Sequence, residues 1–208
     1  LRNDDGEFII NPETGMRVMS TDTKNLGKVA PDWTMGIGNT LSYKGLSLSF
    51  LLDFRVGGVM YSGTVSDLRV TGVAEETASR GRDKFVDKGV IANGDGTYRG
   101  NDVEVTPYQY WTTNYSSKIT EANVFDATFI KLREIVLNYS LPKKWFRNTS
   151  IGQLSLGIEA RNLWLIKSNV PHIDPEASIF GPSSVGSGVE YAAIPSTRSL
   201  GFNIKLTF

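Results

Sequence analysis

Apolar and polar residues alternate along several stretches of this 208-residue chain. From Trp33 to Tyr43 every second residue is apolar except Asn39, and the residues between them are small or polar. Residues 46–56 repeat the pattern, with leucine, phenylalanine and valine on one parity. Because successive side chains of a β-strand point to opposite faces, each stretch predicts a strand with one apolar and one mainly polar face.

Lys44-Gly45 separates these two stretches and predicts a two-residue hairpin turn. Glycine at the second central position accepts the positive φ angle that a type I′ turn requires. In that register Tyr43 pairs with Leu46, so both apolar faces lie on the same side of the hairpin.

The same alternation predicts three further strands, one of which carries an irregularity. Between Phe129 and Arg133, the cations Lys131 and Arg133 fall on the parity that is otherwise apolar. A β-bulge, or a rise of the strand out of the apolar zone, would account for them. Pro142 ends this strand because it cannot donate to a β-ladder. The five predicted strands are 33–43, 46–56, 128–141, 153–166 and 199–208.

The connections between these strands alternate between short and long. Residues 44–45 and 142–152 form short turns, whereas 57–127 and 167–198 are long loops, and residues 1–32 resemble a third long loop. The first long loop has no sustained period, although its charged stretch 65–88 is a candidate for a short helix. Loops of this length are unusual in a compact soluble domain.

Strand length and loop pattern indicate which solvent the apolar face meets. The strands are near ten residues or longer, above the soluble mode of ~5–6 and close to the ~9–11 that cross a bilayer. Short turns at one end and long loops at the other are typical of outer-membrane barrels. Aromatic residues near the strand ends resemble interfacial girdles: Trp33, Tyr43, Tyr139, Trp164 and Phe208. The pattern favours an all-β transmembrane antiparallel barrel, and a soluble β-rich module that binds carbohydrate or protein is the alternative.

Five strands are too few for a closed membrane barrel. In lipid an open sheet would leave the backbone groups of its edges without hydrogen-bond partners. Eight strands is about the smallest membrane barrel. We therefore expect the chain to be part of a larger barrel, and its start at Leu1 rather than Met agrees with that expectation.

Composition excludes several function classes. Lys and Arg together number 22 and so do Asp and Glu, so there is no overall basic charge for binding nucleic acid. The absence of Cys and the single His exclude a disulfide scaffold, a thiol nucleophile and a site built from several Cys or His ligands. No stretch reaches the ~18 apolar residues of a membrane-spanning helix.

Other motifs give only weak indications of catalysis or metal binding. His172 and Asp174 lie two residues apart, but no Gly-x-Ser-x-Gly elbow supplies a nucleophile, so we expect no enzymatic activity. The segments 93–96, 101–102 and 3–7 carry oxygen ligands that calcium accepts, yet none reproduces a twelve-residue calcium loop. Turn formation explains their Asn, Asp and Gly residues, so we expect no cofactor and keep calcium in the longer loop as a minor alternative.

A series of short motifs carries a resemblance over residues 25–208. In order they are Pro31-Asp32-Trp33-Thr34, Ser42-Tyr43-Lys44-Gly45-Leu46-Ser47, Asp53-Phe54-Arg55-Val56-Gly57-Gly58, Asp126-Ala127-Thr128-Phe129-Ile130-Lys131-Leu132-Arg133, Tyr139-Ser140-Leu141-Pro142, Arg161-Asn162-Leu163-Trp164, Asp174-Pro175-Glu176 and Ile194-Pro195. In this order and spacing the chain resembles the C-terminal end of a SusC/RagA-type TonB-dependent outer-membrane transporter. The loop 57–127 matches that family only at its ends.

The resemblance implies a 22-stranded barrel in the outer membrane of a Gram-negative bacterium, of which these would be the last five strands. Family members import oligosaccharides or peptides under a SusD-like surface lipoprotein. TonB supplies the energy through a plug domain that this chain does not contain. The two short turns and the C-terminus would face the periplasm, and loops 1–32, 57–127 and 167–198 would be extracellular. The apolar parity would contact outer-membrane lipid.

Two groups of residues are candidate sites. Four aromatic residues cluster in the first long loop, where they could contact a glycan or peptide substrate or a partner protein, or pack the loop onto itself: Tyr108, Tyr110, Trp111 and Tyr115. Five charged residues on the polar parity would face the barrel lumen and pair with each other, bind the plug or contact substrate: Asp53, Arg55, Glu134, Glu159 and Arg161.

Phe208 is an aromatic residue at the closing edge of the predicted barrel, and it resembles the terminal signal used in outer-membrane assembly. Deleting Phe208 from the full-length protein should therefore lower the amount of folded protein in the membrane, measured by surface labelling. Unchanged surface levels would leave Phe208 only a lipid-facing residue of the girdle.

Overall fold

The computed structural model describes residues 1–79, 81–180 and 188–208. Arg80 and residues 181–187, which fall in the predicted loops 57–127 and 167–198, lie outside the described residues. The chain divides into two compact units, and each is considered by itself. Unit 1 comprises Leu1–Gly27, Met60–Phe125 and Ser178–Ala193, and unit 2 comprises Lys28–Val59, Asp126–Ala177 and Ile194–Phe208.

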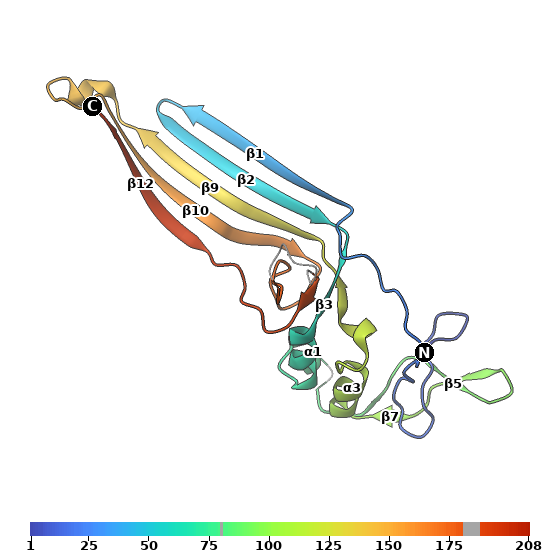
Figure 1. Ribbon diagram of the computed structural model, residues 1–208. Coiled ribbons are helices and arrows are strands. Elements are labelled where there is room, and N and C mark those ends of the chain that lie inside the picture. The colour runs from blue at the N-terminus through green and yellow to red at the C-terminus, as the bar shows by residue number, and fades with distance from the viewer. Residues whose placement is uncertain (80, 181–187) are drawn as a thin grey trace. The chain divides into compact units, whose positions relative to one another are not determined.

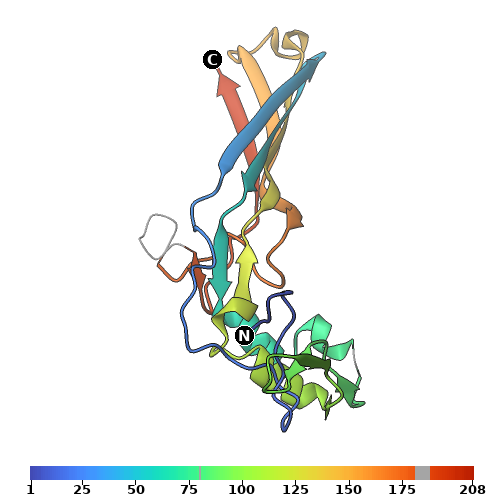
Figure 2. The same ribbon diagram turned by 90° about the vertical axis from the view of Figure 1, so that its right-hand side faces the viewer.

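Unit 2 is built on an antiparallel five-stranded sheet (Figure 1). Its strands are β1 (Trp33–Tyr43), β2 (Leu46–Val56), β9 (Phe129–Ser140), β10 (Gln153–Ser168) and β12 (Ser199–Thr207). They lie side by side in the order β1-β2-β9-β10-β12. Each end agrees with its predicted position to about two residues or better. In the turned view of Figure 2 the strands cross one another at an angle, as expected of a twisted sheet.

The hairpin between β1 and β2 has the predicted turn and register. Lys44 has a φ angle of 47° and Gly45 one of 87°, so both central residues are in the left-handed region that a type I′ turn requires. Tyr43 pairs with Leu46, which sets the apolar parities of the two strands on one face. The turn also contacts the next strand, because Ser140 N donates to Gly45 O at 2.8 Å.

One face of the sheet is apolar across all five strands. The register places one such row in line, namely Leu41, Leu48, Leu137, Ile158 and Phe202. Within unit 2 this face is not covered: Leu41 is 59% exposed, Ile158 50% and Phe202 88%. An apolar surface of this extent is costly in water but fits the hydrocarbon of a membrane.

A β-bulge in β9 confirms the predicted irregularity. The register with β2 shifts between Leu51, which faces Glu134, and Leu52, which faces Leu132. Arg133 is the additional residue, and the pairing with β10 shifts at the same place. Because one extra residue inverts the alternation, Lys131 lies on the same side of the sheet as Glu134, away from the apolar face.

Unit 1 is formed by short elements, which include more helix than the sequence predicted. Its helices are α1 (Gly63–Val70), α2 (Glu75–Ala78), α3 (Pro107–Asn114) and the 3-10 helix η1 (Thr120–Asn123). Strand β4 (Phe85–Val86) pairs with β7 (Glu104–Val105), β5 (Val90–Ala92) pairs with β6 (Tyr98–Gly100), and a small sheet has the order β11 (Val189–Glu190), β3 (Val59–Ser62), β8 (Val124–Asp126). The first two helices confirm the candidate helix in residues 65–88.

Helix α3 was missed, although its start carries a sequence signal. Thr106 Oγ1 accepts from Gln109 N at 3.2 Å, and Gln109 Oε1 accepts from Thr106 N at 3.0 Å. This is a capping box, and Pro107 occupies the first helical turn, where proline is favoured. Among the described residues, no helix is long and apolar enough to cross a membrane.

The contact between the β1–β2 turn and β9 generates a testable prediction. A Cβ atom added at Gly45 would lie 2.8 Å from Ser140 O, whereas one at Gly94, with a similar φ of 85°, would meet nothing within 4 Å. We expect Gly94→Ala to cost ~1–2 kcal/mol of unfolding free energy from backbone strain alone. Gly45→Ala should cost at least about 1 kcal/mol more, because backbone must also move. Equal thermal unfolding midpoints for the two variants would contradict a tight contact at Gly45.

Candidate functional site

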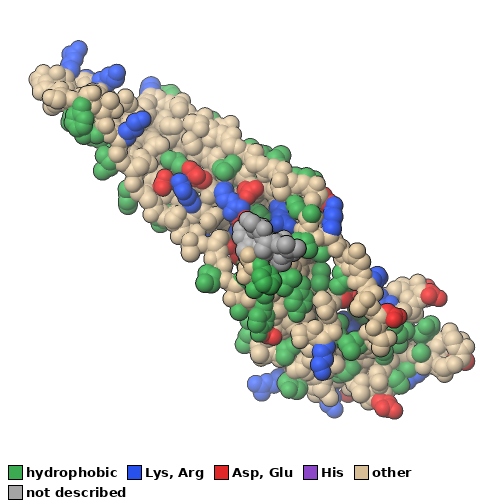
Figure 3. Space-filling model, in the orientation of Figure 1, with side chains coloured by type: hydrophobic (Ala, Val, Ile, Leu, Met, Phe, Trp, Pro, Cys, Tyr) green, Lys and Arg blue, Asp and Glu red, His purple; other side chains and the backbone are tan. Residues whose placement is uncertain are grey.

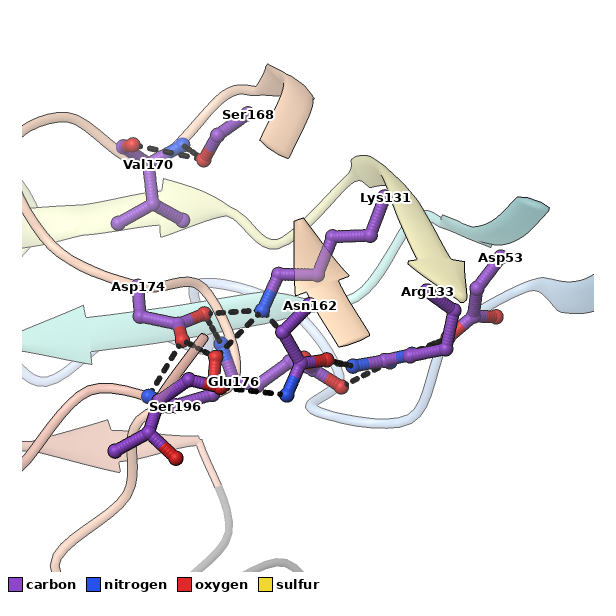
Figure 4. Close-up of polar contacts among 10 residues, drawn as sticks. Asp53, Lys131, Arg133, Asn162, Ser168, Val170, Asp174, Glu176 and Ser196 are labelled. Carbon is purple, nitrogen blue, oxygen red and sulfur yellow. Dashed lines mark hydrogen bonds and ion pairs between the residues drawn. The ribbon is translucent and has the colours of Figure 1, made fainter. Parts of the chain in front are cut away.

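Charged side chains form a network on the polar face of the sheet in unit 2 (Figure 4). We call it the polar-face network, and its members are Asp53 on β2, Lys131 and Arg133 on β9, Asn162 on β10, and Asp174, Glu176 and Ser196 from the segments between β10 and β12. The network thus joins three neighbouring strands to the two ends of the predicted loop 167–198.

Lys131 is the buried centre of the network. Its Nζ lies 2.7 Å from Asp174 Oδ1, 2.5 Å from Glu176 Oε2 and 3.2 Å from Ser196 Oγ. The Lys131 side chain is only 5% exposed, and that of Asp174 is 9% exposed. A buried ammonium group is tolerated only when its donors are satisfied, and these three acceptors match its three donors.

Arg133 connects the loop to β2 and β10. Its Nη1 and Nη2 donate to the two carboxylate oxygens of Glu176 at 2.8 and 2.6 Å, which is the bidentate geometry that favours arginine. Its Nε also donates to Asp53 Oδ2 at 3.0 Å, and Nη2 contacts the same oxygen. Nη1 is 3.2 Å from Asn162 Oδ1.

Asp174, near one end of the loop 167–198, binds Ser196 near the other end. Its Oδ2 accepts from Ser196 N at 2.9 Å and from Ser196 Oγ. Burial raises the pKa of Asp174, but hydrogen bonds from Lys131 and Ser196 outweigh it and lower the pKa from 3.8 to about 2. A carboxylate with a lowered pKa in the folded state adds stability above its unfolded pKa. That contribution is therefore complete at neutral pH and is lost progressively as the pH falls from 3.8 through about 2.

Two local features place these side chains. The bulge at Arg133 places Lys131 on the polar face, and the side chain of Arg133 itself contacts Asp53 there. On β10, Asn162 has a φ of 49°, a left-handed conformation that asparagine tolerates better than most residues. This irregularity lets Asn162 contact Arg133 while its Nδ2 donates to Thr197 O at 3.1 Å.

The network contains two cations and three carboxylates, which satisfy one another. Burial alone would raise the pKa of Glu176, but hydrogen bonds donated by Arg133 and Lys131 outweigh it and lower the pKa, so Glu176 remains ionised. These contacts hold the returning loop against the polar face of the sheet. The arrangement is suited to positioning the loop rather than to activating a nucleophile.

The five charged residues predicted to face a lumen lie on the polar face but have different roles. Asp53 belongs to the network, and Arg55 Nη2 donates to Val29 O at 2.9 Å. Arg161 and Glu134 pair across neighbouring strands at 3.8 Å, with side chains 57% and 39% exposed. Glu159 faces Gly201. Their contact with a plug or substrate stays a prediction.

The aromatic cluster mainly packs unit 1. Tyr110 and Trp111 are buried with Met16 and Val105, and Tyr115 packs against them. Arg17 Nη2 donates to Tyr110 Oη at 3.3 Å, and Arg17 Nε lies 2.8 Å from Oδ2 of buried Asp87. Tyr108 differs, because it is 75% exposed. Contact of this cluster with a ligand or partner stays a prediction. Tyr108 is its most exposed member and therefore the most accessible for such a contact.

The remaining predicted sites are placed as follows. Asp95 accepts from Thr97 within its turn, and Asp102 pairs with Arg99 at 2.6 Å. Among the described residues, no group of three or more His, Cys, Asp or Glu side chains is arranged to hold a metal ion. Calcium in these loops stays a prediction. Phe208 follows the end of β12 and is 84% exposed.

The sequence did not predict the polar-face network, although the segments that form it carry recognisable patterns. Lys131 and Arg133 stood out as cations on an apolar parity, and Asp174-Pro175-Glu176 was part of a motif. The feature that could have predicted their contact is the equal spacing of the charges: two cations lie two residues apart, and so do two carboxylates. Residues 174–177 form a turn, in which Ala177 N donates to Asp174 O at 2.9 Å, and this turn brings both carboxylates to the cations of β9.

Known proteins resemble this chain in sequence. No protein-family model matches it. TonB-dependent receptor P3 of Formosa agariphila is 25% identical over 206 residues, which cover 96% of this chain and 19% of that protein. TonB-dependent receptor P26 of the same organism is 26% identical over 204 residues, covering 94% and 19%. The chain thus spans about a fifth of the length of these curated relatives.

Solved structures share the fold. The RagAB peptide importer in its closed-closed state matches with a TM-score of 0.62 and 20% identity, over 97% of this chain and 22% of that one. Its open-open state gives 0.60 at the same identity and coverage. The predicted resemblance to TonB-dependent transporters is confirmed, and so is the β-rich fold. The sheet is not closed into a barrel within the described residues.

The burial of Lys131 generates a prediction with a matched control. Lys131→Met keeps the length of the side chain but leaves Asp174 and Glu176 without their shared cation, so the unfolding free energy should fall by about 3 kcal/mol. Protease cleavage between residues 169 and 177 should also become faster. Arg161→Met removes an exposed, longer ion pair and should cost less than ~1 kcal/mol. Equal losses in the two variants would contradict the central role of Lys131.

Proposed function

We propose that this chain is the C-terminal part of the barrel of a TonB-dependent importer in a Gram-negative outer membrane. The observation that carries the proposal is the five-stranded sheet with one uncovered apolar face and an opposite face that holds polar networks. The sequence and structure comparisons support it, because the chain is similar over nearly its full length to TonB-dependent receptors.

Strand length agrees with a membrane crossing. Strands β1 and β2 each have 11 residues. At ~3.3 Å per residue such a strand is about 36 Å long. Tilted by ~40°, it rises about 28 Å, close to the ~25 Å apolar band of outer-membrane barrels.

The edges of the sheet require further strands. Strands β1 and β12 each pair with one neighbour in the five-stranded sheet. In lipid, the unpaired backbone groups on their outer sides would each cost several kcal/mol, on the order of the penalty for a buried polar group without a partner. We propose that other parts of the protein continue the sheet on both sides, in the 22-stranded barrel that the resemblance implies.

The polar face would then line the transport path. The polar-face network holds residues 174–176 and Ser196 against β2, β9 and β10. We propose that it shapes the wall of the path near the outer opening, with the long loops extracellular and the short turns periplasmic. Tyr108, exposed on α3, is the aromatic residue best placed for substrate or partner contact.

The substrate and the partners are part of the same proposal. RagAB is described as a peptide importer. We propose that this protein imports nutrient peptides or oligosaccharides, that a SusD-like surface lipoprotein covers its opening, and that TonB drives the cycle through the plug domain. No catalytic step is assigned to the chain, whose relatives are receptors and transporters.

Membrane location is tested first. The full-length protein should sediment with outer membranes, require detergent for extraction and migrate faster on gels before boiling than after it, as barrels that resist detergent do. A protein that is monodisperse without detergent would contradict the proposal and would favour a soluble binding module.

Uptake is tested in the same cells. Fluorescent oligopeptides and oligosaccharides should accumulate in cells that carry the protein, and one class should depend on both the protein and TonB. Deletion of TonB should abolish that uptake while surface binding remains. Uptake that survives the TonB deletion would contradict energised import.

A further inference from the structure

We propose that one end of the sheet in unit 2 binds the phosphate groups of anionic lipids at the membrane surface. We call this end the basic tip, and it consists of Lys44 in the β1–β2 turn and Lys143, Lys144 and Arg147 in the β9–β10 connection, which contains the 3-10 helix η2 (Lys143–Phe146). The inference rests on the proposed membrane-spanning function, which it extends by a specific lipid partner.

No acidic side chain lies at the basic tip. Residues 40–50, 139–156 and 202–208 make up this end of the sheet, and none of their side chains is acidic. The basic ones are Lys44, Lys143, Lys144, Arg147 and Lys205. Figure 3 shows blue and no red side chains at this end of the visible face. Elsewhere in unit 2 the cations of β9 are paired with carboxylates, so this accumulation is specific to the tip.

The turn and the connection form one surface. Ser140 N donates to Gly45 O at 2.8 Å, which joins the end of β9 to the hairpin turn. Leu141 N donates to Leu154 O at 2.9 Å, and Gly152 N donates to Thr207 O at 2.6 Å. These bonds hold the connection beside the hairpin and the end of β12, so the cations are presented together.

The basic side chains are available for a ligand. Lys44, Lys143, Lys144 and Arg147 are all exposed. None of the four forms an ion pair within the part of the chain that the structure describes. Lys44 Nζ lies 5.1 Å from the ring centre of Tyr43 and remains free to donate to phosphate oxygens.

The position of the tip identifies a lipid rather than a soluble polyanion. It directly continues the uncovered apolar face, which ends in exposed Tyr43 (70%) and Tyr139, and Trp145 (62%) projects from the connection among the cations. Aromatic rings prefer the boundary between hydrocarbon and headgroups, and long basic side chains extend from there to the phosphates. This spatial order, from the apolar face through the aromatic rings to the basic groups, matches the order of hydrocarbon, interface and headgroups in one leaflet of a bilayer.

Anionic headgroups should therefore be retained in preference to zwitterionic ones. A lipid with net negative charge attracts basic groups near the membrane surface, whereas a zwitterionic lipid has no net charge to attract them. The attraction is electrostatic, so it should weaken as salt shortens the screening length.

The test uses the full-length protein in a neutral detergent with equimolar phosphatidylglycerol and phosphatidylcholine, and native mass spectrometry counts the bound lipids. We expect the protein to retain phosphatidylglycerol over phosphatidylcholine about tenfold at low salt. The variant K44Q/K143Q/K144Q/R147Q should lose most of this preference. The matched control K24Q/R82Q/K88Q/K118Q removes three exposed lysines and one exposed arginine of unit 1 and should keep the preference.

Three results would overturn the assignment: equal retention of the two lipids, a preference that survives in the tip variant, or a preference lost equally in the control. Displacement of phosphatidylglycerol by polyglutamate without loss of other lipids would identify an acidic polypeptide as the ligand and would also overturn it. A protein that needs no detergent would refute the membrane function itself, and this outcome is distinct from a membrane protein without headgroup preference.

Discussion

The alternation of side chains across a β-strand is the constraint on which the rest of unit 2 depends. It places Leu41, Leu48, Leu137, Ile158 and Phe202 in one apolar row across the sheet. It also fixes where charge can be placed, because any group on the opposite parity lies on the polar face. The bulge at Arg133 is the local exception that brings Lys131 and Arg133 to that face. If β9 alternated regularly through Arg133 with no bulge, both cations would lie on the apolar face.

The sequence predicted the parts of the fold that depend on neighbouring residues. The strand ends, the type I′ turn at Lys44-Gly45 and the irregularity in β9 follow from local period and turn chemistry, and they agree with the structure. Helix α3 was missed because its apolar residues pack onto unit 1 without a regular period, although Thr106-Pro107 and Gln109 form a recognisable start.

The polar-face network could not be predicted in full because its partners come from distant parts of the chain. Arg133 and Asp53 are 80 residues apart, and Lys131 and Ser196 are 65 apart. The sequence identified Asp53 and the off-parity cations, but only the path of the returning chain decides which carboxylates meet them. The same reason explains the aromatic cluster: composition located it, whereas contacts with Met16 and Val105 showed that three of its four members form a core.

The two ends of the sheet in unit 2 differ in whether their cations are paired with carboxylates, and this difference makes the two ends distinguishable. At the end where the long connections attach, Lys131 and Arg133 are neutralised by carboxylates within the protein, and these ion pairs hold the loop against the polar face of the sheet. At the end with the short turns, the cations have no acidic neighbours in sequence, and their charge is directed outward. In the proposed barrel, loops held by internal ion pairs at one end and basic turns at the other would distinguish the two sides of the membrane. Cations occur at both ends of the sheet, so the ends differ only in whether carboxylates of the protein pair with those cations.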